Sequence, residues 1–568
     1  MKKIILTSAS ALAFTAAAPL FAQAVVPPAC VGVTGNCSVI DSTGTGVTAN
    51  VDQSGGTGNV SDVVQDGDTL TATVDQDADG NISNIDQTTP GVGATDLTAT
   101  VTQAGGADSV VSQSAGGLNS GIMSATVTQN GASASDIAQT TANETANNFV
   151  ATVNQTGDGH SSIISQADLG GGLNDGDLTT TVTQTGAGNS SDVSQFNRQN
   201  TATIIQSGND SSSTVVQSSI TGRQNTANVT QTGDDGVSNV EQQGRSNLTT
   251  LNQSGTGNES DVFQDDAGAV GQTATITQTG SGNFTGIFQD GRNPGPDDGN
   301  NFATITQDGD NGFATVEQVD QARGDTATIT QSAGTDGADA GIVQTGDAVD
   351  GAPATASVAT INQTSGTNNF SFIVQGDTSA FGGVTGGAND ATATSNQAGD
   401  NLSSLIVQGG ATQVAFVDQI GDGNESTVVQ GDFGGASGDT NVDQDGNNGT
   451  SLVFQNSDSS DADLFQIGEG NFSAIDQGFA GGAGTGADGN VADVTQGGDD
   501  NFSEVTQNLA TAGGLNMATV LQDGNDNTSF IEQEGTSNSA NVMQALDGNT
   551  SSVFQDGTGN TVTVTQGM

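Results

Sequence analysis

Basic and aromatic side chains are nearly missing from this chain of 568 residues. It has 7 Lys and Arg against 64 Asp and Glu, a single His, and neither Trp nor Tyr. The formal net charge of -57 excludes binding to nucleic acid, whose phosphates need a basic surface, and adsorption to anionic lipid. The single histidine, His160, excludes any catalytic or metal site that needs two histidines.

Large apolar residues are also scarce, because hydrophobic types make up only 32% of the chain. Such a chain cannot fill the several globular cores that its length would otherwise suggest. Low hydrophobicity with a high net charge favours disorder. Against disorder, Val, Ile and Thr recur in short and regularly spaced runs, which predict an ordered repeat.

The first 24 residues have the pattern of a secretory signal peptide. Lys2 and Lys3 form a charged region, residues 4–18 are apolar, and Ala22-Gln23-Ala24 fits the small-x-small rule for cleavage. The apolar run is short, and no other segment reaches the roughly 18 apolar residues that a membrane-spanning helix needs. We therefore expect a secreted chain that starts near Val25 and does not insert into a membrane.

Cysteine is limited to Cys30 and Cys37, in an N-terminal segment that we place at residues 25–48. In an oxidising compartment two cysteines so close together predict a small disulfide loop. A metal site is disfavoured, because two thiols without a nearby histidine supply too few ligands.

One glutamine marks a repeat that runs over residues 49–568. It recurs at about 41 positions from Gln53 to Gln566, most often at intervals of about eleven residues. Counted from Gln53, odd-to-even intervals stay between about 10 and 13 residues, whereas even-to-odd intervals range from about 11 to 22. The repeating unit is therefore a pair of segments with one tight connection and one connection that accepts insertions.

Each segment has the alternation of a β-strand, as in Thr181-Val182-Thr183-Gln184. Alternation places Gln and the preceding Val or Ile on one face and the Thr residues on the other. Gly and Asn follow, as a tight turn requires. These features predict an all-β fold, a parallel β-solenoid of about 20 two-strand coils whose variable loops all lie on one edge.

The glutamines and turn asparagines predict ladders of buried amides. A stacked solenoid places the same residue above itself in successive coils, so each amide can donate to one neighbour and accept from the other. This arrangement avoids the cost of an orphaned buried amide, about 1–3 kcal/mol. The predicted ladder residues are Gln184, Asn189, Gln195, Gln206, Gln217, Gln231, Gln242, Gln253, Asn258, Gln264, Gln278, Asn283, Gln289, Gln555, Asn560 and Gln566.

The motif Gln-x-Gly-x-Gly-Asn, then five residues and Gln, is most regular at residues 184–195, 253–264 and 278–289. It resembles the curlin repeat of curli fibre subunits. The resemblance implies a secreted subunit of extracellular amyloid-like fibres, with roles in adhesion and biofilm matrix. It also implies export through a curli-type outer-membrane pore and end-to-end self-association.

Other functions remain as alternatives. A non-polymerising surface adhesin or matrix protein would share the solenoid. Asp297-Asp298-Gly299 and Asp499-Asp500-Asn501 offer oxygen ligands, so weak calcium binding in acidic loops stays open, without a dedicated site or any other cofactor. Thr-x-Thr rows such as Thr275 and Thr277 resemble ice-binding faces. We expect no enzyme, because most Asp residues adjoin Gly in turns, where Asp is common anyway.

Overall fold

The computed structural model describes residues 24–89, 96–116, 121–141, 148–168, 177–197, 199–219, 224–266, 271–291, 300–319, 324–345, 356–376, 390–409, 412–431, 438–455, 459–478, 489–508 and 515–567. Residues 1–23 of the expected signal peptide lie outside these ranges. The chain forms two compact units, unit 1 at residues 1–194 and unit 2 at residues 195–568, and the division falls within strand β13 (Ser190–Asn197).

Unit 1 begins with the short 3-10 helix η1 (Pro28–Cys30) and continues as strands that alternate between two parallel sheets. Sheet A contains β1 (Cys37–Thr43), β3 (Val60–Asp66), β5 (Ile82–Thr88), β7 (Asp108–Ala115), β9 (Ala134–Thr141) and β11 (Ser161–Asp168). Sheet B contains β2 (Thr48–Asp52), β4 (Leu70–Gln76), β6 (Leu97–Ala104), β8 (Met123–Asn130), β10 (Phe149–Thr156) and β12 (Leu178–Thr185).

Unit 2 continues the same alternation. Its sheet A contains β15 (Ser212–Ser219), β17 (Val237–Gly244), β19 (Glu259–Asp266), β21 (Phe284–Gly291), β23 (Phe313–Val319), β26 (Asp339–Thr345), β28 (Phe370–Gln375), β30 (Ser403–Gln408), β32 (Glu425–Gln430), β34 (Thr450–Gln455), β36 (Phe472–Gln477), β38 (Phe502–Asn508), β40 (Thr528–Thr536) and β42 (Thr550–Thr558). Its sheet B contains β14 (Asn200–Gln206), β16 (Asn225–Gln231), β18 (Leu248–Gln253), β20 (Thr273–Gln278), β22 (Phe302–Gln307), β24 (Thr326–Gln331), β27 (Val358–Thr367), β29 (Thr392–Ala398), β31 (Val414–Ile420), β33 (Asp439–Asn447), β35 (Asp461–Glu469), β37 (Val491–Gly497), β39 (Met517–Asp523), β41 (Ser539–Gln544) and β43 (Thr561–Gln566), with the two-residue β25 (Thr335–Asp336) beside β27.

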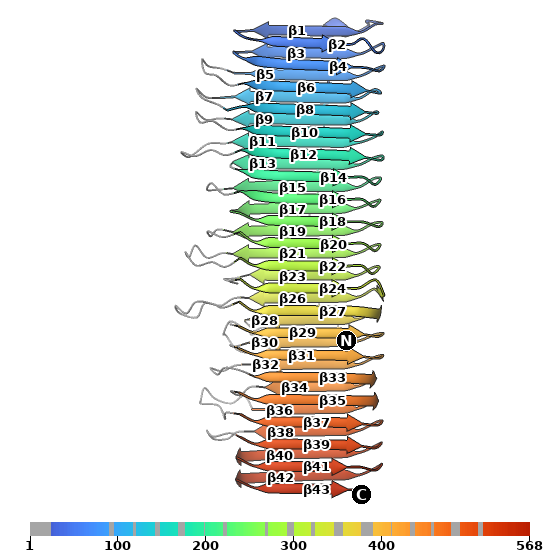
Figure 1. Ribbon diagram of the computed structural model, residues 1–568, viewed down its shortest axis with the longest axis vertical. Helices are drawn as coiled ribbons and strands as arrows, with labels where there is room; N and C mark the ends of the chain where they lie inside the picture. The colour runs from blue at the N-terminus through green and yellow to red at the C-terminus, as the bar shows by residue number, and fades with distance from the viewer. Residues whose placement is uncertain are drawn as a thin grey trace. The chain divides into compact units, whose positions relative to one another are not determined.

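Within each unit the strands pair in parallel with the strand two places along, and the register aligns equivalent residues (Figure 1). The short β25 shifts the numbering once, so that β23 pairs with β26 and β24 with β27. Gln129 of β8, for example, pairs with Gln155 of β10, which pairs with Gln184 of β12. Side chains alternate between buried and exposed along each strand. The parallel β-solenoid is therefore confirmed, and the 43 described strands, two to a coil, agree with the expected count of about 20 coils.

The two edges of the coil differ, as the glutamine intervals predict. Connections from sheet B to sheet A are short throughout the described residues, as between β16 and β17. Connections from sheet A to sheet B vary, and the longest separates Gln375 of β28 from Thr392 of β29. Because all strands of a sheet run the same way, every variable connection starts at the same edge of its unit.

Glycine in the tight turns is required by the approach of the next coil. Gly255 has a φ of +100°, and a Cβ there would lie 2.1 Å from the carbonyl oxygen of Gly280. Gly257, in the same turn, has a φ of +68° but nothing within 4 Å of its Cβ position. The first position therefore combines steric overlap with backbone strain, whereas the second carries only strain.

This contrast predicts that Gly255→Ala lowers the free energy of unfolding by about 2 kcal/mol and Gly257→Ala by about 1 kcal/mol. Urea titrations followed by far-ultraviolet circular dichroism measure both. Equal losses for the two variants would show that the coil-to-coil approach at Gly255 relaxes without cost.

Candidate functional site: the amide ladders and the end strands

The side chains that recur from coil to coil form two ladders of glutamine, one in each sheet. Gln231 is fully buried, and its Nε2 donates to Oε1 of Gln253 at 2.8 Å and to the backbone oxygen of Ser212 at 3.1 Å. The same amide-to-amide bond recurs at 2.7–3.0 Å in both units. The predicted ladder glutamines all face inward, and only Gln566, in the last strand, is half-exposed.

Each ladder has a direction. In the glutamine pairs that the described residues form within a unit, the residue nearer the N-terminus donates and the residue nearer the C-terminus accepts, as in Gln53 to Gln76 and Gln544 to Gln566, both at 2.8 Å. A ladder of this kind ends on an acceptor at one side and on a donor at the other. The two ends of the repeat array are therefore chemically different.

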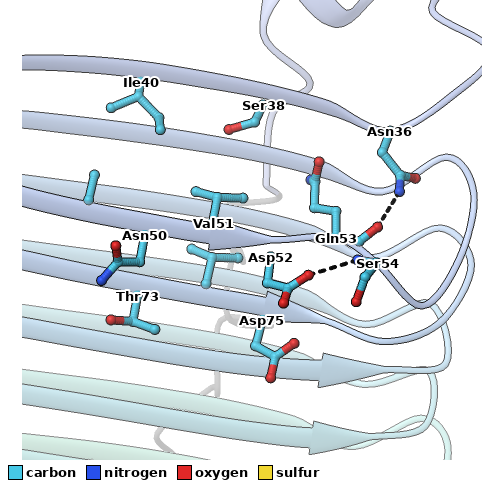
Figure 2. Close-up of a pocket in the computed structure, with 12 residues that line it drawn as sticks. Asn36, Ser38, Ile40, Asn50, Val51, Asp52, Gln53, Ser54, Thr73 and Asp75 are labelled. Atoms are coloured by element: carbon cyan, nitrogen blue, oxygen red, sulfur yellow. Dashed lines mark hydrogen bonds between the residues drawn. The ribbon is translucent and has the colours of Figure 1, made fainter.

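The N-terminal end of unit 1 is the first coil, formed by β1 and β2. An open hollow of about 860 Å³ lies at this end, and it is lined by inward side chains such as Ile40 and Val51 and by outward ones such as Asn50 and Asp75 (Figure 2). No described strand pairs with the outer edges of β1 and β2, which are bonded only to β3 and β4. This end thus presents a row of backbone groups and a partly open core.

Strand β1 begins twelve residues before the repeat expected from residue 49. It lacks the marker glutamine, because Ser42 aligns with Gln65 of β3 and its Oγ donates to Gln65 Oε1 at 3.0 Å. The sequence does contain an indication of this first coil. Asn36 precedes Ser42 by six residues, and Asn59 precedes Gln65 by the same number. Cys37 opens β1, and its sulfur is bonded to that of Cys30 in η1.

The C-terminal end of unit 2 is formed by β42 and β43. Strand β43 carries no charge, and its inward residues Val562, Val564 and Gln566 are half-buried. Among the described residues, β43 pairs only with β41 and β42 only with β40. The Nε2 of Gln566 donates to the backbone oxygen of Thr550 at 2.9 Å, which leaves its second N–H directed to the open side.

The turn asparagines form side-chain pairs in only some places, such as Asn81 Nδ2 to Oδ1 of Asn59 at 3.2 Å, and others bond to the backbone instead. Asn283 Oδ1 accepts the backbone N–H of Gly312 at 2.8 Å, and its Nδ2 donates to the backbone oxygen of Gly309 at 2.7 Å. A short Asn side chain reaches the backbone of the next coil before it reaches the next side chain. Asn189 and Asn258 are buried in the same type of turn, whereas Asn560, in the last coil, is exposed.

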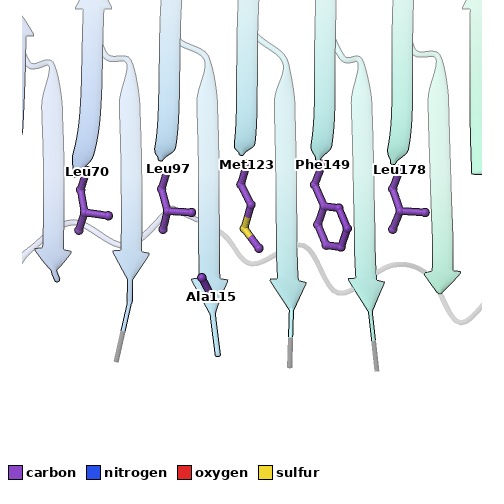
Figure 3. Close-up of a cluster of buried hydrophobic side chains, with 6 residues drawn as sticks. All are labelled: Leu70, Leu97, Ala115, Met123, Phe149 and Leu178. Carbon is purple, nitrogen blue, oxygen red and sulfur yellow. The ribbon is translucent and has the colours of Figure 1, made fainter. Parts of the chain in front are cut away.

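The corner where each sheet B strand begins is built differently in the two units. In unit 1 the residue six places before each glutamine is large and apolar, and Leu70, Leu97, Met123, Phe149 and Leu178 stack with Ala115 nearby (Figure 3). In unit 2 the same place holds a polar residue in most coils, such as the buried Asn200, Asn225 and Asn247. Unit 1 therefore closes this corner by apolar packing and unit 2 by hydrogen bonds.

Asp325 occupies an asparagine place in this corner of unit 2. Its side chain is 4% exposed, and Oδ1 accepts the backbone N–H of Ser357 at 2.7 Å. Burial raises the pKa of this carboxyl from its usual value near 4 to about 6, although the hydrogen bond from Ser357 opposes the shift. A charged group has thus replaced a neutral amide with the same shape.

His160 occupies an asparagine place in a tight turn of unit 1. It is buried, its Nδ1 accepts the backbone N–H of Asn189 at 3.3 Å, and its Nε2 lies 3.1 Å from the backbone oxygen of Thr156. These contacts assign the proton to Nε2 and engage both ring nitrogens. The single histidine is therefore a structural part of a turn.

Carboxylates line up on the outer face of sheet B in unit 2. Asp418 aligns with Asp443, and Asp463 aligns with Asp493. Partial burial raises the pKa values of Asp418, Asp443 and Asp493, and neighbouring carboxylates raise them further. In the part of the chain that the structure describes, no three such groups are arranged to hold a metal ion.

The two acidic stretches considered for calcium have different outcomes. Asp297-Asp298-Gly299 lies outside the described residues. In the second stretch, Oδ1 of Asp499 accepts the backbone N–H of Glu469 at 2.9 Å, and Asp500 has a φ of +54°. Both residues therefore serve the turn, and calcium binding there remains a prediction.

Comparison with known families gives one match. The family model described as the curlin associated repeat matches residues 299–332 and 512–535, which include β22 to β24, β39 and all of β40 except Thr536. No curated protein sequence matches the chain. None of the helical structure in the described residues is long and apolar enough to cross a membrane.

Proposed function

We propose that this chain, which matches the curlin associated repeat at residues 299–332 and 512–535, is a secreted structural subunit that joins end to end into extracellular amyloid-like fibres. One observation carries the proposal: the repeat array ends on strands whose outer edges pair with no described strand. Free strand edges template the addition of another chain. By analogy with that family, the proposed fibre would support adhesion and the biofilm matrix, and the chain would be exported through a curli-type outer-membrane pore. The proposed function involves no catalysis.

The two ends are complementary in register. If β43 of one copy continued sheet B of another, Gln566 would stand over Gln53 and Val564 over Val51. Likewise β42 would continue sheet A, with Val553 over Ile40. Most contacts would repeat ones that successive coils already make within the chain, including the parallel backbone ladder, and the exception is Gln555, which would stand over Ser42.

The direct test is fibre formation by the purified chain from residue 25 onward, followed by thioflavin fluorescence and electron microscopy. We expect fibres from the unaltered protein and none from Val564→Lys, which places a charge on the inward face of the last strand. The control Thr563→Lys places the same charge on the outer face and should still assemble. If the unaltered chain stays monomeric under all conditions, it is a non-polymerising adhesin or matrix solenoid.

The charge of the chain predicts how fast assembly proceeds. At neutral pH and low salt the carboxylates repel one another between copies and lengthen the lag before fibres grow. The raised pKa values of Asp418 and Asp443 mean that these groups take up protons at a higher pH than ordinary carboxyls, so repulsion begins to fall before the pH reaches about 4. Millimolar calcium should screen the same charges.

We therefore expect a shorter lag at pH 4 than at pH 8, and at high salt than at low salt, measured by thioflavin fluorescence. The double variant Asp418→Asn and Asp443→Asn should shorten the lag at pH 8 and change it little at pH 4. Identical lag times at both pH values and both salt concentrations would show that charge repulsion does not control assembly.

A further inference from the structure

The two glutamine ladders end differently in the first coil. In sheet B the ladder ends on Gln53, and none of the described residues donates to its Oε1. In sheet A it ends one coil later, on Gln65, and the first coil has Ser42 in that place. The N-terminal end therefore offers one amide acceptor where a complete coil would offer two.

The last coil, in contrast, offers two donors. Gln555 and Gln566 each use one N–H of Nε2 on a backbone oxygen, of Ser539 at 3.0 Å and of Thr550 at 2.9 Å. In the coils before them, the second N–H donates to the glutamine of the following coil, as in Gln533 to Gln555 at 2.7 Å. At an end-to-end joint, Nε2 of Gln566 would donate to Oε1 of Gln53 in the next copy, whereas Nε2 of Gln555 would face Ser42.

We propose that Ser42 is a specificity-determining residue that weakens the joint between two copies relative to the contact between coils of one chain. This inference rests on the proposed fibre function. Serine lacks the amide carbonyl that Gln555 would meet in a complete coil. Its hydroxyl, which donates to Gln65 and can still accept, lies two bonds nearer the backbone than the oxygen of a glutamine. A donor that meets a more distant acceptor gains less from the contact.

The surroundings of Ser42 show that a longer side chain has room there. Ser42 is itself exposed, and Ile40, two residues earlier on the same face of β1, is 48% exposed. In the next coil, Gln65 occupies the aligned place with its Nε2 bonded to the backbone oxygen of Thr48 at 3.2 Å. A glutamine at position 42 would extend the same pattern by one rung.

The direction of the ladders adds a second consequence. Two N-terminal ends would present only acceptors to each other, and two C-terminal ends only donors, so neither pair could continue a ladder. Copies therefore join only head to tail, and each joint contains one Ser42.

The test is the critical concentration for fibre formation by the full chain from residue 25, at fixed pH and salt. Ser42→Gln should lower it by about tenfold, equivalent to about 1.4 kcal/mol per joint. Thr43→Gln adds the same side chain to the outer face of the same strand and should leave it unchanged. Circular dichroism before assembly establishes that each variant is folded.

The outcomes separate this inference from the function on which it rests. Fibres from the unaltered chain with an equal or higher critical concentration for Ser42→Gln would overturn the role of Ser42 and leave the fibre function standing. If only the Ser42→Gln variant forms fibres, Ser42 weakens the joint enough to prevent assembly of the unaltered chain. If neither protein assembles, both the inference and the proposed function fail.

Discussion

Replacing Asp325 with Asn should raise the free energy of unfolding by about 3 kcal/mol at pH 7 and by almost nothing at pH 4. The carboxyl has a pKa of about 6 in the folded chain against a usual value of 3.8, a difference of about two units at about 1.4 kcal/mol each. The folded state thus holds this proton more tightly than the unfolded state. Its contribution to stability is complete below about pH 4 and is lost as the pH rises through about 6.

Asparagine removes that dependence because it keeps the shape and the acceptor for the N–H of Ser357 without the charge. Urea titrations followed by circular dichroism at pH 7 and pH 4 measure the effect on unaggregated protein. The control is Asp310→Asn, since Oδ1 of Asp310 also accepts a backbone N–H, from Ser281 at 2.8 Å, but in an exposed turn. The control should change stability by less than about 0.5 kcal/mol. A gain at Asp325 that is equal at both pH values would refute the assignment to burial of charge.

The sequence predicts the strands and their pairing because two patterns, the alternation within each strand and the spacing of the glutamines, agree with each other. Alternation of Val and Thr around Gln231 fixes which side chains face inward, and the recurrence of glutamine fixes the register from coil to coil. Both are local properties that a solenoid repeats, since each coil contacts only its neighbours. The edge that carries insertions is predictable for the same reason.

The exceptions could not be predicted in this way because each depends on what surrounds a single position. Ser42 stands where the other coils of sheet A have the marker glutamine, so the recurrence of glutamine does not indicate the first coil. His160 and Asp325 differ in chemistry from asparagine, and only their burial and contacts show that they take its place. The apolar corner of unit 1, with Leu97 and Phe149, has a regular spacing, since each of these residues lies six places before a ladder glutamine.

Replacing Gln231 with Leu should lower the free energy of unfolding of its neighbourhood by about 4 kcal/mol, because two buried amide groups lose their partners at about 1–3 kcal/mol each. The Nε2 of Gln206 loses the acceptor that it reaches at 2.8 Å, and Oε1 of Gln253 loses its donor at 2.8 Å. Leucine fills a similar volume, so the loss reports hydrogen bonding more than packing.

The loss at Gln231 should also be local, because a solenoid couples each coil mainly to the next. Amide hydrogen exchange should therefore accelerate in β14, β16 and β18 and remain unchanged in β41 and β43. Thr230→Leu is the matched control, since it adds the same side chain on the outer face of the same strand and should change stability by less than about 0.5 kcal/mol. If the two variants lose equal stability, the amide ladder does not hold the coils together, and end-to-end growth would have to rely on the backbone edges and the Val and Ile columns alone.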